Sequence, residues 1–170
     1  MFRALFSLVL IAFVSCAAET AAVPLPPEPE TLEDTALSAD DRLLVDLVNE
    51  LRSTGCRCGN RTYPAVAPVV WNQRLDTAAA RHATDMHRNQ EMTHTGSDGS
   101  SVGDRVTRTG YRWRTVAENV AWGYHDVESV FRGWKDSPGH CKNILNAEVR
   151  EMGFGRSGDY WAQTFATQFN

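Results

Sequence analysis

The order of the hydrophobic patterns along this chain constrains its fold more than any other feature. Apolar residues recur at helical spacing over residues 43–51 and again over 71–86. The chain closes with two strand-like runs, 149–155 and 160–169, which a turn at 157–159 joins as a hairpin. Helices first, then strands mixed with helices and a closing antiparallel hairpin, predict an α+β domain built in layers.

The middle of the chain adds shorter elements to this pattern. A buried strand is expected at 116–122, and helices are expected at 102–109, 127–134 and 138–145. The segment 55–68 contains glycine, proline and two cysteines, and we interpret it as a loop.

The first sixteen residues, 1–16, have the pattern of a secretion signal. A charged start is followed by an apolar run that is too short to span a bilayer. Cys16 at the end of this run resembles the lipid-modified cysteine of a bacterial lipoprotein, and plain cleavage after Ala17 or Ala18 is the alternative. Either outcome exports the domain, and a lipid on Cys16 is the only membrane attachment that we expect.

Residues 17–37 are rich in proline and acidic side chains and contain no aromatic residue. Such a segment buries too little apolar surface to fold, so we interpret it as a disordered linker before a single domain at 38–170. The net charge of -4 and the lack of any Lys/Arg cluster leave no basic surface for nucleic acid.

Two histidines and one glutamate are the candidate site residues: His94, Glu118 and His140. About two dozen residues separate each from the next, so they meet only if the fold brings three elements together. Imidazole and carboxylate suit zinc and other divalent metals, and three protein ligands leave a position open for water. The alternative is a polar cluster in which both histidines hydrogen-bond Glu118 without a metal.

An enzymatic interpretation uses the same residues. Glu118 would activate a water molecule in a metal-dependent hydrolase. Ser137 lies three residues before His140 but lacks a nucleophile elbow, so we interpret it as the N-cap of the helix that carries His140. His82 falls on the apolar face of its helix, which is typical of a core residue.

Several motifs resemble, in their order, the CAP superfamily of SCP-domain proteins, which includes cysteine-rich secretory proteins, venom antigen five and plant pathogenesis-related proteins. The resemblance covers residues 43–169, and its Ser-Pro-Gly-His segment is similar to bacterial members. The motifs are Trp71-Asn72-x-x-Leu75, Ala78-Ala79-x-x-His82, His94-Thr95-Gly96, Gly110-Tyr111, Ala117-Glu118-Asn119, Trp134-x-x-Ser137-Pro138-Gly139-His140, Met152-Gly153 and Tyr160-Trp161-x-Gln163-x-Phe165. The resemblance implies a three-layer α-β-α sandwich with a mostly antiparallel central sheet.

The resemblance also implies a cleft in which two histidines and two acids bind a divalent metal, usually zinc. His94, Glu118 and His140 match three of these positions. The fourth position is Ser137 in this chain, and the preceding Asp136 is a candidate substitute.

Cys56, Cys58 and Cys141 remain if Cys16 carries a lipid, and one disulfide is expected among them in an oxidising compartment. The resemblance to bacterial relatives implies a Cys58–Cys141 pair, which leaves Cys56 free. A Cys56–Cys58 bridge is the alternative, although its geometry is strained.

Some members of the superfamily bind sterols or fatty acids, which implies an apolar groove as a further alternative. Trp113, Trp122, Tyr124 and Phe131 are the aromatic residues that would line it, unless they belong to the core. The sequence therefore predicts an exported binding or interaction module rather than an enzyme. Its expected partner is a small molecule, a lipid or a component of the cell envelope.

Overall fold

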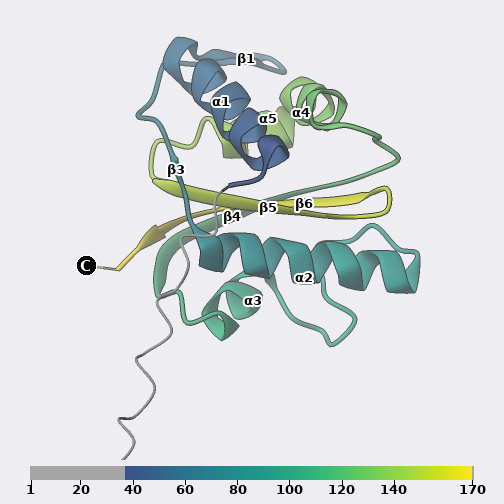
Figure 1. Cartoon of the computed structure of the whole chain (residues 1–170). Coiled ribbons are helices and arrows are strands. Elements are labelled where there is room, and N and C mark those ends of the chain that lie inside the picture. The colour runs from purple at the N-terminus through teal and green to yellow at the C-terminus, as the bar shows by residue number, and fades with distance from the viewer. Residues whose placement is uncertain (1–36, 170) are drawn as a thin grey trace, which may run out of the picture. The chain divides into compact units, whose positions relative to one another are not determined.

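A four-stranded sheet forms the middle layer of the molecule, and helices cover both of its faces (Figure 1). The structure is a computed structural model that describes residues 37–169. The helices are α1 (Ala39–Thr54), α2 (Gln73–Asn89), α3 (Val102–Arg108), α4 (Val127–Asp136) and α5 (Pro138–Ile144). The strands are β1 (Cys56–Cys58), β2 (Arg61–Tyr63), β3 (Val70–Trp71), β4 (Trp113–Trp122), β5 (Glu151–Ser157) and β6 (Tyr160–Gln168).

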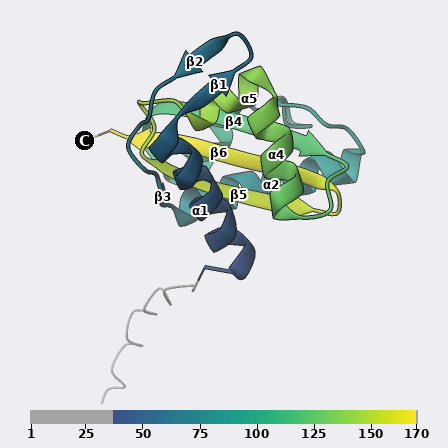
Figure 2. The same ribbon diagram turned by 90° about the horizontal axis from the view of Figure 1, so that it is seen from above.

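The central sheet has the strand order β3-β5-β6-β4. Strands β5, β6 and β4 pair antiparallel, whereas β3 pairs in parallel with β5 at one edge. Helices α1, α4 and α5 and the separate β1–β2 hairpin lie over one face, while α2 and α3 lie over the other (Figures 1 and 2). The predicted α+β sandwich with a mostly antiparallel sheet is confirmed.

Strand β6 is buried on both faces because successive side chains of a strand point to opposite sides. Trp161 and Phe165 belong to the core that also contains buried residues of α1, α4 and α5. Ala162 and Ala166 belong to the two smaller clusters on the side of α2 and α3. The sheet therefore separates two cores.

Helix α1 begins with a capping box at Ser38. The Ser38 side chain accepts a hydrogen bond from the backbone of Asp41, and the Asp41 carboxylate accepts one from the backbone of Ser38. This capping box satisfies two backbone donors that a helix start otherwise leaves free. The helix ends before Gly55, whose φ of 67° favours glycine.

Arg52 on α1 is fully buried, and among the described residues every acceptor of its side chain is a backbone carbonyl. Its guanidinium donates to the carbonyl oxygens of Ala67, Ile144, Asn146 and Val149 over 2.6 to 3.3 Å. Burial, with a smaller contribution from the charge of Arg150, lowers the pKa of Arg52 to about 10, so the group is still charged at neutral pH. It joins α1 to the segments that enter β3 and β5.

Two predictions about local structure were wrong, and a third was correct in position only. The segment 55–68 is not only loop, because it contains the β1–β2 hairpin. Trp71 lies in β3 rather than on the second helix, which begins at Gln73 after the Asn72 cap. Ser137 is the N-cap residue of α5, but its side chain makes no capping hydrogen bond. Strands of two or three residues are too short to show an alternating pattern.

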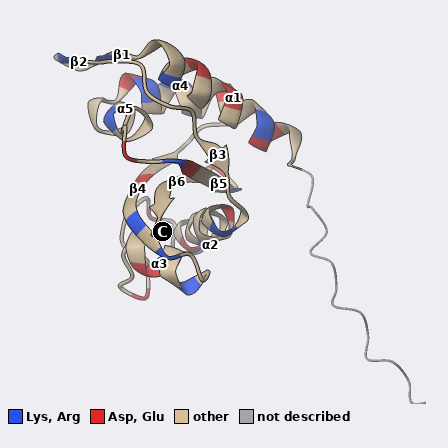
Figure 3. Cartoon of the chain, turned by 90° about the vertical axis from the view of Figure 1, so that its left-hand side faces the viewer, with Lys and Arg blue, Asp and Glu red and all other residues tan. Residues whose placement is uncertain are grey.

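The predicted leader at 1–16, with Cys16, lies outside the described residues, as does all but the last residue of the predicted linker at 17–37. Within the described part of the chain, no helix combines the length and the apolar character needed to cross a membrane. Acidic and basic side chains occur together on α1 and on α3 (Figure 3).

Helix α2 packs so closely on β5 that two strand positions have no room for a side chain. A Cβ at Gly153 would lie 2.1 Å from the backbone nitrogen of Asp76, and a Cβ at Gly155 would lie 2.2 Å from the Cα of Ala80. These glycines therefore set the distance between the sheet and the helix that leads to the candidate site.

We expect Gly155→Ala to destabilise the protein by about 1–3 kcal/mol, because the added methyl group must push backbone apart. Urea unfolding followed by circular dichroism measures the change. Gly139→Ala in α5 is the matched control, since a Cβ there meets nothing within 4 Å. Equal stability of the two variants would contradict this account of the packing.

Candidate functional site

The Glu118 carboxylate is the centre of the candidate site. Glu118 lies on β4, and its side chain is only 3% exposed. Its Oε1 accepts a hydrogen bond from Nδ1 of His94 over 2.9 Å, and its Oε2 accepts one from Nη2 of Arg105 over 2.6 Å. The buried charge thus has an opposite charge and a second donor beside it, as a buried carboxylate requires.

Arg105 is held in place by α3 and by the loop before it. The capping box of Ser101 and Asp104 begins α3 one turn before the arginine. The buried guanidinium also donates to the carbonyl oxygens of Ser100 and His94 over 2.8 and 3.1 Å. Arg105 therefore fixes both Glu118 and the loop that carries His94. Sequence analysis missed this residue, since no sequence motif marks it.

The hydrogen bond to Glu118 determines which nitrogen of His94 carries a proton. An ionised carboxylate only accepts hydrogen bonds, so Nδ1 of His94 must be the donor. The Nε2 atom of the neutral ring then keeps its lone pair, and the side chain is 60% exposed. The hydrogen bond to Glu118 raises the pKa of His94, although partial burial opposes it.

His82 of α2 forms the buried wall of the site. Its Nε2 lies 2.8 Å from the carbonyl oxygen of Thr93 and 3.9 Å from Oε1 of Glu118. A carbonyl accepts hydrogen bonds, so Nε2 is the donor and Nδ1 is an acceptor; this Nδ1 has no hydrogen-bond partner among the described residues. Burial lowers the pKa of His82 and keeps the ring neutral, despite the opposing charge of Glu118. The core residue that the sequence predicts thus also contacts the candidate site.

His140 approaches from the opposite layer of the sandwich. Glu118 faces the α2 side of the sheet with Val120, whereas the adjacent Asn119 faces α5. The Asn119 side chain donates to the His140 carbonyl oxygen over 3.3 Å, and Asn143 donates to the Glu118 carbonyl oxygen over 3.0 Å. Helix α5 is thereby held at the edge of the sheet.

The two imidazoles are near enough to influence one another. Burial is the main cause that lowers the pKa of His140, and the charge of His94 lowers it further. His140 is half-buried, and its neutral ring is the form that can bind a metal.

The three predicted ligands, His94, Glu118 and His140, do not have all of their ligand atoms close together as a three-ligand metal site would. Within residues 37–169, Cys56, Cys58 and Cys141 are the only group of three or more metal-ligating side chains whose ligand atoms all lie within 4.8 Å of one another. Both Glu118 oxygens are already hydrogen-bonded, so the groups that fit a divalent metal are the two imidazoles. Asp136 is exposed and Ser137 is partly buried, and in the described part of the chain neither side chain hydrogen-bonds His94, Glu118 or His140.

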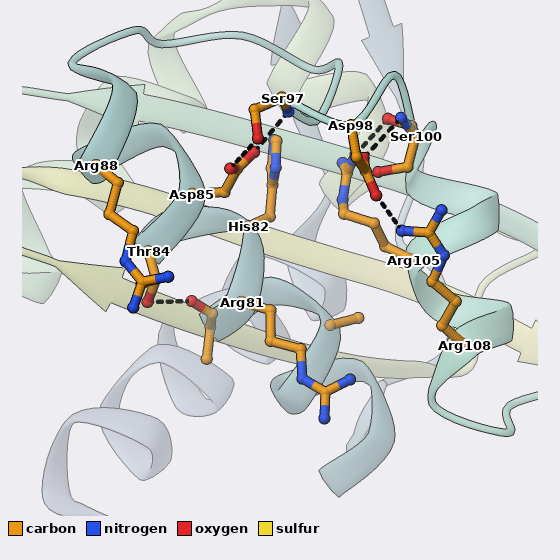
Figure 4. A pocket seen from close by; sticks show the side chains of 12 residues that line it. Arg81, His82, Thr84, Asp85, Arg88, Ser97, Asp98, Ser100, Arg105 and Arg108 are labelled. Carbon is orange, nitrogen blue, oxygen red and sulfur yellow. Dashed lines mark hydrogen bonds and ion pairs between the residues drawn. The ribbon is translucent and has the colours of Figure 1, made fainter.

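An open pocket of about 560 Å³ lies beside Glu118 on the α2 and α3 side (Figure 4). His82 and Arg105 contribute to its wall, so the pocket and the Glu118 cluster share two side chains. Its lining residues are Ala78, Ala80, Arg81, His82, Thr84, Asp85, Arg88, Ser97, Asp98, Ser100, Arg105 and Arg108. Arg105 is paired with Glu118 and Arg108 with Asp98, so Arg81 and Arg88 against Asp85 leave the pocket positive.

The four aromatic residues proposed for an apolar groove are dispersed. Phe131 and Tyr124 belong to or pack against the core on the α1 side of the sheet. Trp113 packs against the cluster on the α3 side, and Trp122 is 59% exposed. These positions do not form one groove.

We expect Arg105→Met to destabilise the protein by about 3–5 kcal/mol at neutral pH, because it leaves the buried Glu118 charge without its counter-ion. Arg108→Met is the matched control, since the Arg108–Asp98 pair is more than half exposed and its loss should leave the free energy of unfolding nearly unchanged. Denaturant unfolding at pH 7 compares them. Similar losses in both variants would show that Glu118 does not depend on Arg105.

The comparisons with known proteins agree with this architecture. The family model of the cysteine-rich secretory protein family, CAP, matches residues 45–168. Two Bacillus subtilis proteins are similar: the uncharacterized membrane protein YlbC, 27% identical over 128 residues, and the uncharacterized protein YkwD, 28% identical over 137 residues. The matches cover 75% and 79% of this chain but only 34% and 50% of those proteins, so the chain spans half of their length or less.

Two solved structures resemble this fold. An extracellular protein containing an SCP domain from Bacillus anthracis superposes with a TM-score of 0.66 and 27% identity, covering 76% of this chain and 40% of that one. An outer surface protein from Borrelia burgdorferi superposes with a TM-score of 0.63 and 19% identity, covering 75% of this chain and 92% of that one. The layered fold and the match over residues 45–168 lead to one conclusion: this chain belongs to the cysteine-rich secretory protein (CAP) family.

Proposed function

We propose that this protein is an exported binding module that holds a divalent metal ion between the imidazoles of His94 and His140. The observation that carries the proposal is the hydrogen bond from Nδ1 of His94 to Glu118, because it leaves the lone pair of Nε2 available to a metal ion on a side chain that is 60% exposed. In metal sites, a histidine ligand commonly donates its other ring N–H to a carboxylate, which fixes the ring and increases its basicity. Glu118 takes this supporting role rather than that of a ligand.

The charge of the surroundings suits a weak and open metal site. Arg105 already neutralises the charge of the Glu118 carboxylate, so this carboxylate does not add to the attraction for a cation. Two neutral imidazoles suit zinc, copper and nickel, and the remaining coordination positions are left for water or for a group of the bound partner. A site with open positions is suited to recognition of a ligand that itself carries a donor atom.

A binding role has more support than a hydrolase. A hydrolase in which Glu118 activates water needs a carboxylate that reaches solvent, whereas both Glu118 oxygens are hydrogen-bonded and the side chain is nearly buried. Ser137 and His140, both among the described residues, make no hydrogen bond to one another, as a nucleophile and its base would.

Export is part of the proposal. The apolar run at 1–16 has the pattern of a secretion signal, and relatives from Bacillus anthracis and Borrelia burgdorferi are described as extracellular and as an outer surface protein. Lipid attachment at Cys16 is the proposed anchor, with signal cleavage after Ala17 or Ala18 as the alternative. The proposed binding partner is then a component of the cell envelope or of the medium around the cell.

The positive pocket supports a second candidate function, the binding of an anionic small molecule. Arg81 and Arg88 lie on α2 and form no ion pair within the described residues, so their charges are available to a ligand. The pocket volume of about 560 Å³ is that of a site for a small molecule.

We expect zinc titration by calorimetry, without reducing agent, to show one site per chain that His94→Ala and His140→Ala both remove. Glu118→Gln should weaken binding about 10- to 100-fold, because it removes the supporting carboxylate. The affinity should rise with pH: the proton competes for His94, whose pKa is raised, so the competition ends only above that raised pKa.

His125→Ala is the matched control for this titration, because His125 is exposed on the loop before α4. Thermal melts confirm that each variant is folded. Zinc binding that survives in both His94→Ala and His140→Ala would rule out the proposed site.

For the pocket, we expect inorganic pyrophosphate to bind and to perturb the amide resonances of α2 and α3. Arg81→Ser and Arg88→Ser should each weaken binding about two- to fivefold, and added salt should weaken it further. Arg132→Ser on α4, in the opposite layer, should leave the affinity unchanged. Equal effects of all three substitutions would indicate nonspecific attraction rather than a pocket.

A further inference from the structure

Three cysteine sulfur atoms meet between the β1–β2 hairpin and α5, the helix that also carries His140. Cys58 and Cys141 form a disulfide that joins chain positions 83 residues apart. Cys56 is a free thiol, and its Sγ lies 3.3 Å from that of Cys141 and 3.9 Å from that of Cys58. The thiol therefore touches both sulfur atoms of the bridge.

The geometry of β1 explains why the sulfur atoms of Cys56 and Cys58 both face the sulfur atom of Cys141. Cys56 and Cys58 are two residues apart on β1, and side chains at this spacing point to the same side of a strand. That side faces Cys141, which is fully buried on α5. Either cysteine of β1 is therefore placed to bridge to Cys141, and the structure contains one of two available pairings.

We propose that Cys56, Cys58 and Cys141 form a thiol–disulfide exchange site in which the bridge to Cys141 moves between Cys58 and Cys56. Cys56 loses its proton, its side chain turns until its sulfur is in line with the Cys58–Cys141 bond, and its thiolate attacks Sγ of Cys141. The Cys56–Cys141 bond forms while the Cys58–Cys141 bond breaks, and Cys58 leaves as a thiolate that takes up a proton. One thiol and one disulfide are present before and after, so the step needs no oxidant or reductant.

The surroundings of Cys56 set the rate of this exchange. Cys58 is 5% exposed and Cys141 is 0% exposed, so a thiol from solution has poor access to the bridge, whereas Cys56 is already in contact with it. Burial raises the pKa of the Cys56 thiol, and the charge of Lys135 opposes this only in part. The attacking thiolate is therefore scarce at neutral pH, and exchange accelerates as the pH rises.

The test uses the full chain with Cys16→Ser, so that only these three cysteines are scored. The protein is held without reductant at pH 7 and at pH 9, quenched with acid, alkylated with N-ethylmaleimide and mapped by peptide mass spectrometry. We expect the label to move from Cys56 to Cys58 in part of the molecules, sooner at pH 9 than at pH 7. Label that stays on Cys56 alone at both pH values would overturn the proposal.

Two variants make the test independent of the labelling rate. Cys58→Ser should contain a Cys56–Cys141 disulfide and no free thiol, whereas two free thiols in the folded variant would contradict the second pairing. Cys56→Ser should keep the Cys58–Cys141 bridge and take up no label at either pH. Circular dichroism melts verify folding, and the labelling of the parent chain still decides the question if Cys58→Ser does not fold.

Discussion

The ion pair between Glu118 and Arg105 is the interaction on which the candidate site depends. A carboxylate at 3% exposure is costly unless a counter-ion and hydrogen-bond donors reach it, and Arg105 and His94 supply both. Satisfying this one charge brings together β4, α3 and the loop after α2. The orientation of His94 and the shape of the positive pocket both follow from that requirement, because Arg105 contributes to each.

Glu118 lies on the edge strand β4, and this position determines from which layers the two histidines reach the site. Alternation along β4 directs Glu118 to the α2 layer and Asn119 to the α5 layer, so the two histidines come from opposite sides of the sheet. A site in the middle of the sheet could not receive side chains from both layers. Because β4 is an edge strand, the charge of His94 can influence the pKa of His140, while the Glu118 side chain stays buried and supports His94.

Much of the fold follows from sequence, whereas the details of the site do not. The helical spacing of apolar residues over 43–51 predicts α1, and the closing hairpin predicts β5 and β6. Sequence patterns also single out His94, Glu118 and His140. They do not reveal Arg105, because only the folded structure shows that it lies next to Glu118. They also miss the strand at Trp71, because two residues are too few to show an alternating pattern.

Arg52 has a consequence for how freely the neighbouring segments can change during evolution. Each acceptor of its guanidinium is a main-chain oxygen, at Ala67, Ile144, Asn146 and Val149. Replacing the side chains of Ala67 and Asn146 leaves these acceptors in place, whereas Ile144 and Val149 are also buried in the core. Arg52 therefore fixes the course of the main chain before β3 and β5 while leaving the side chains at Ala67 and Asn146 free to vary.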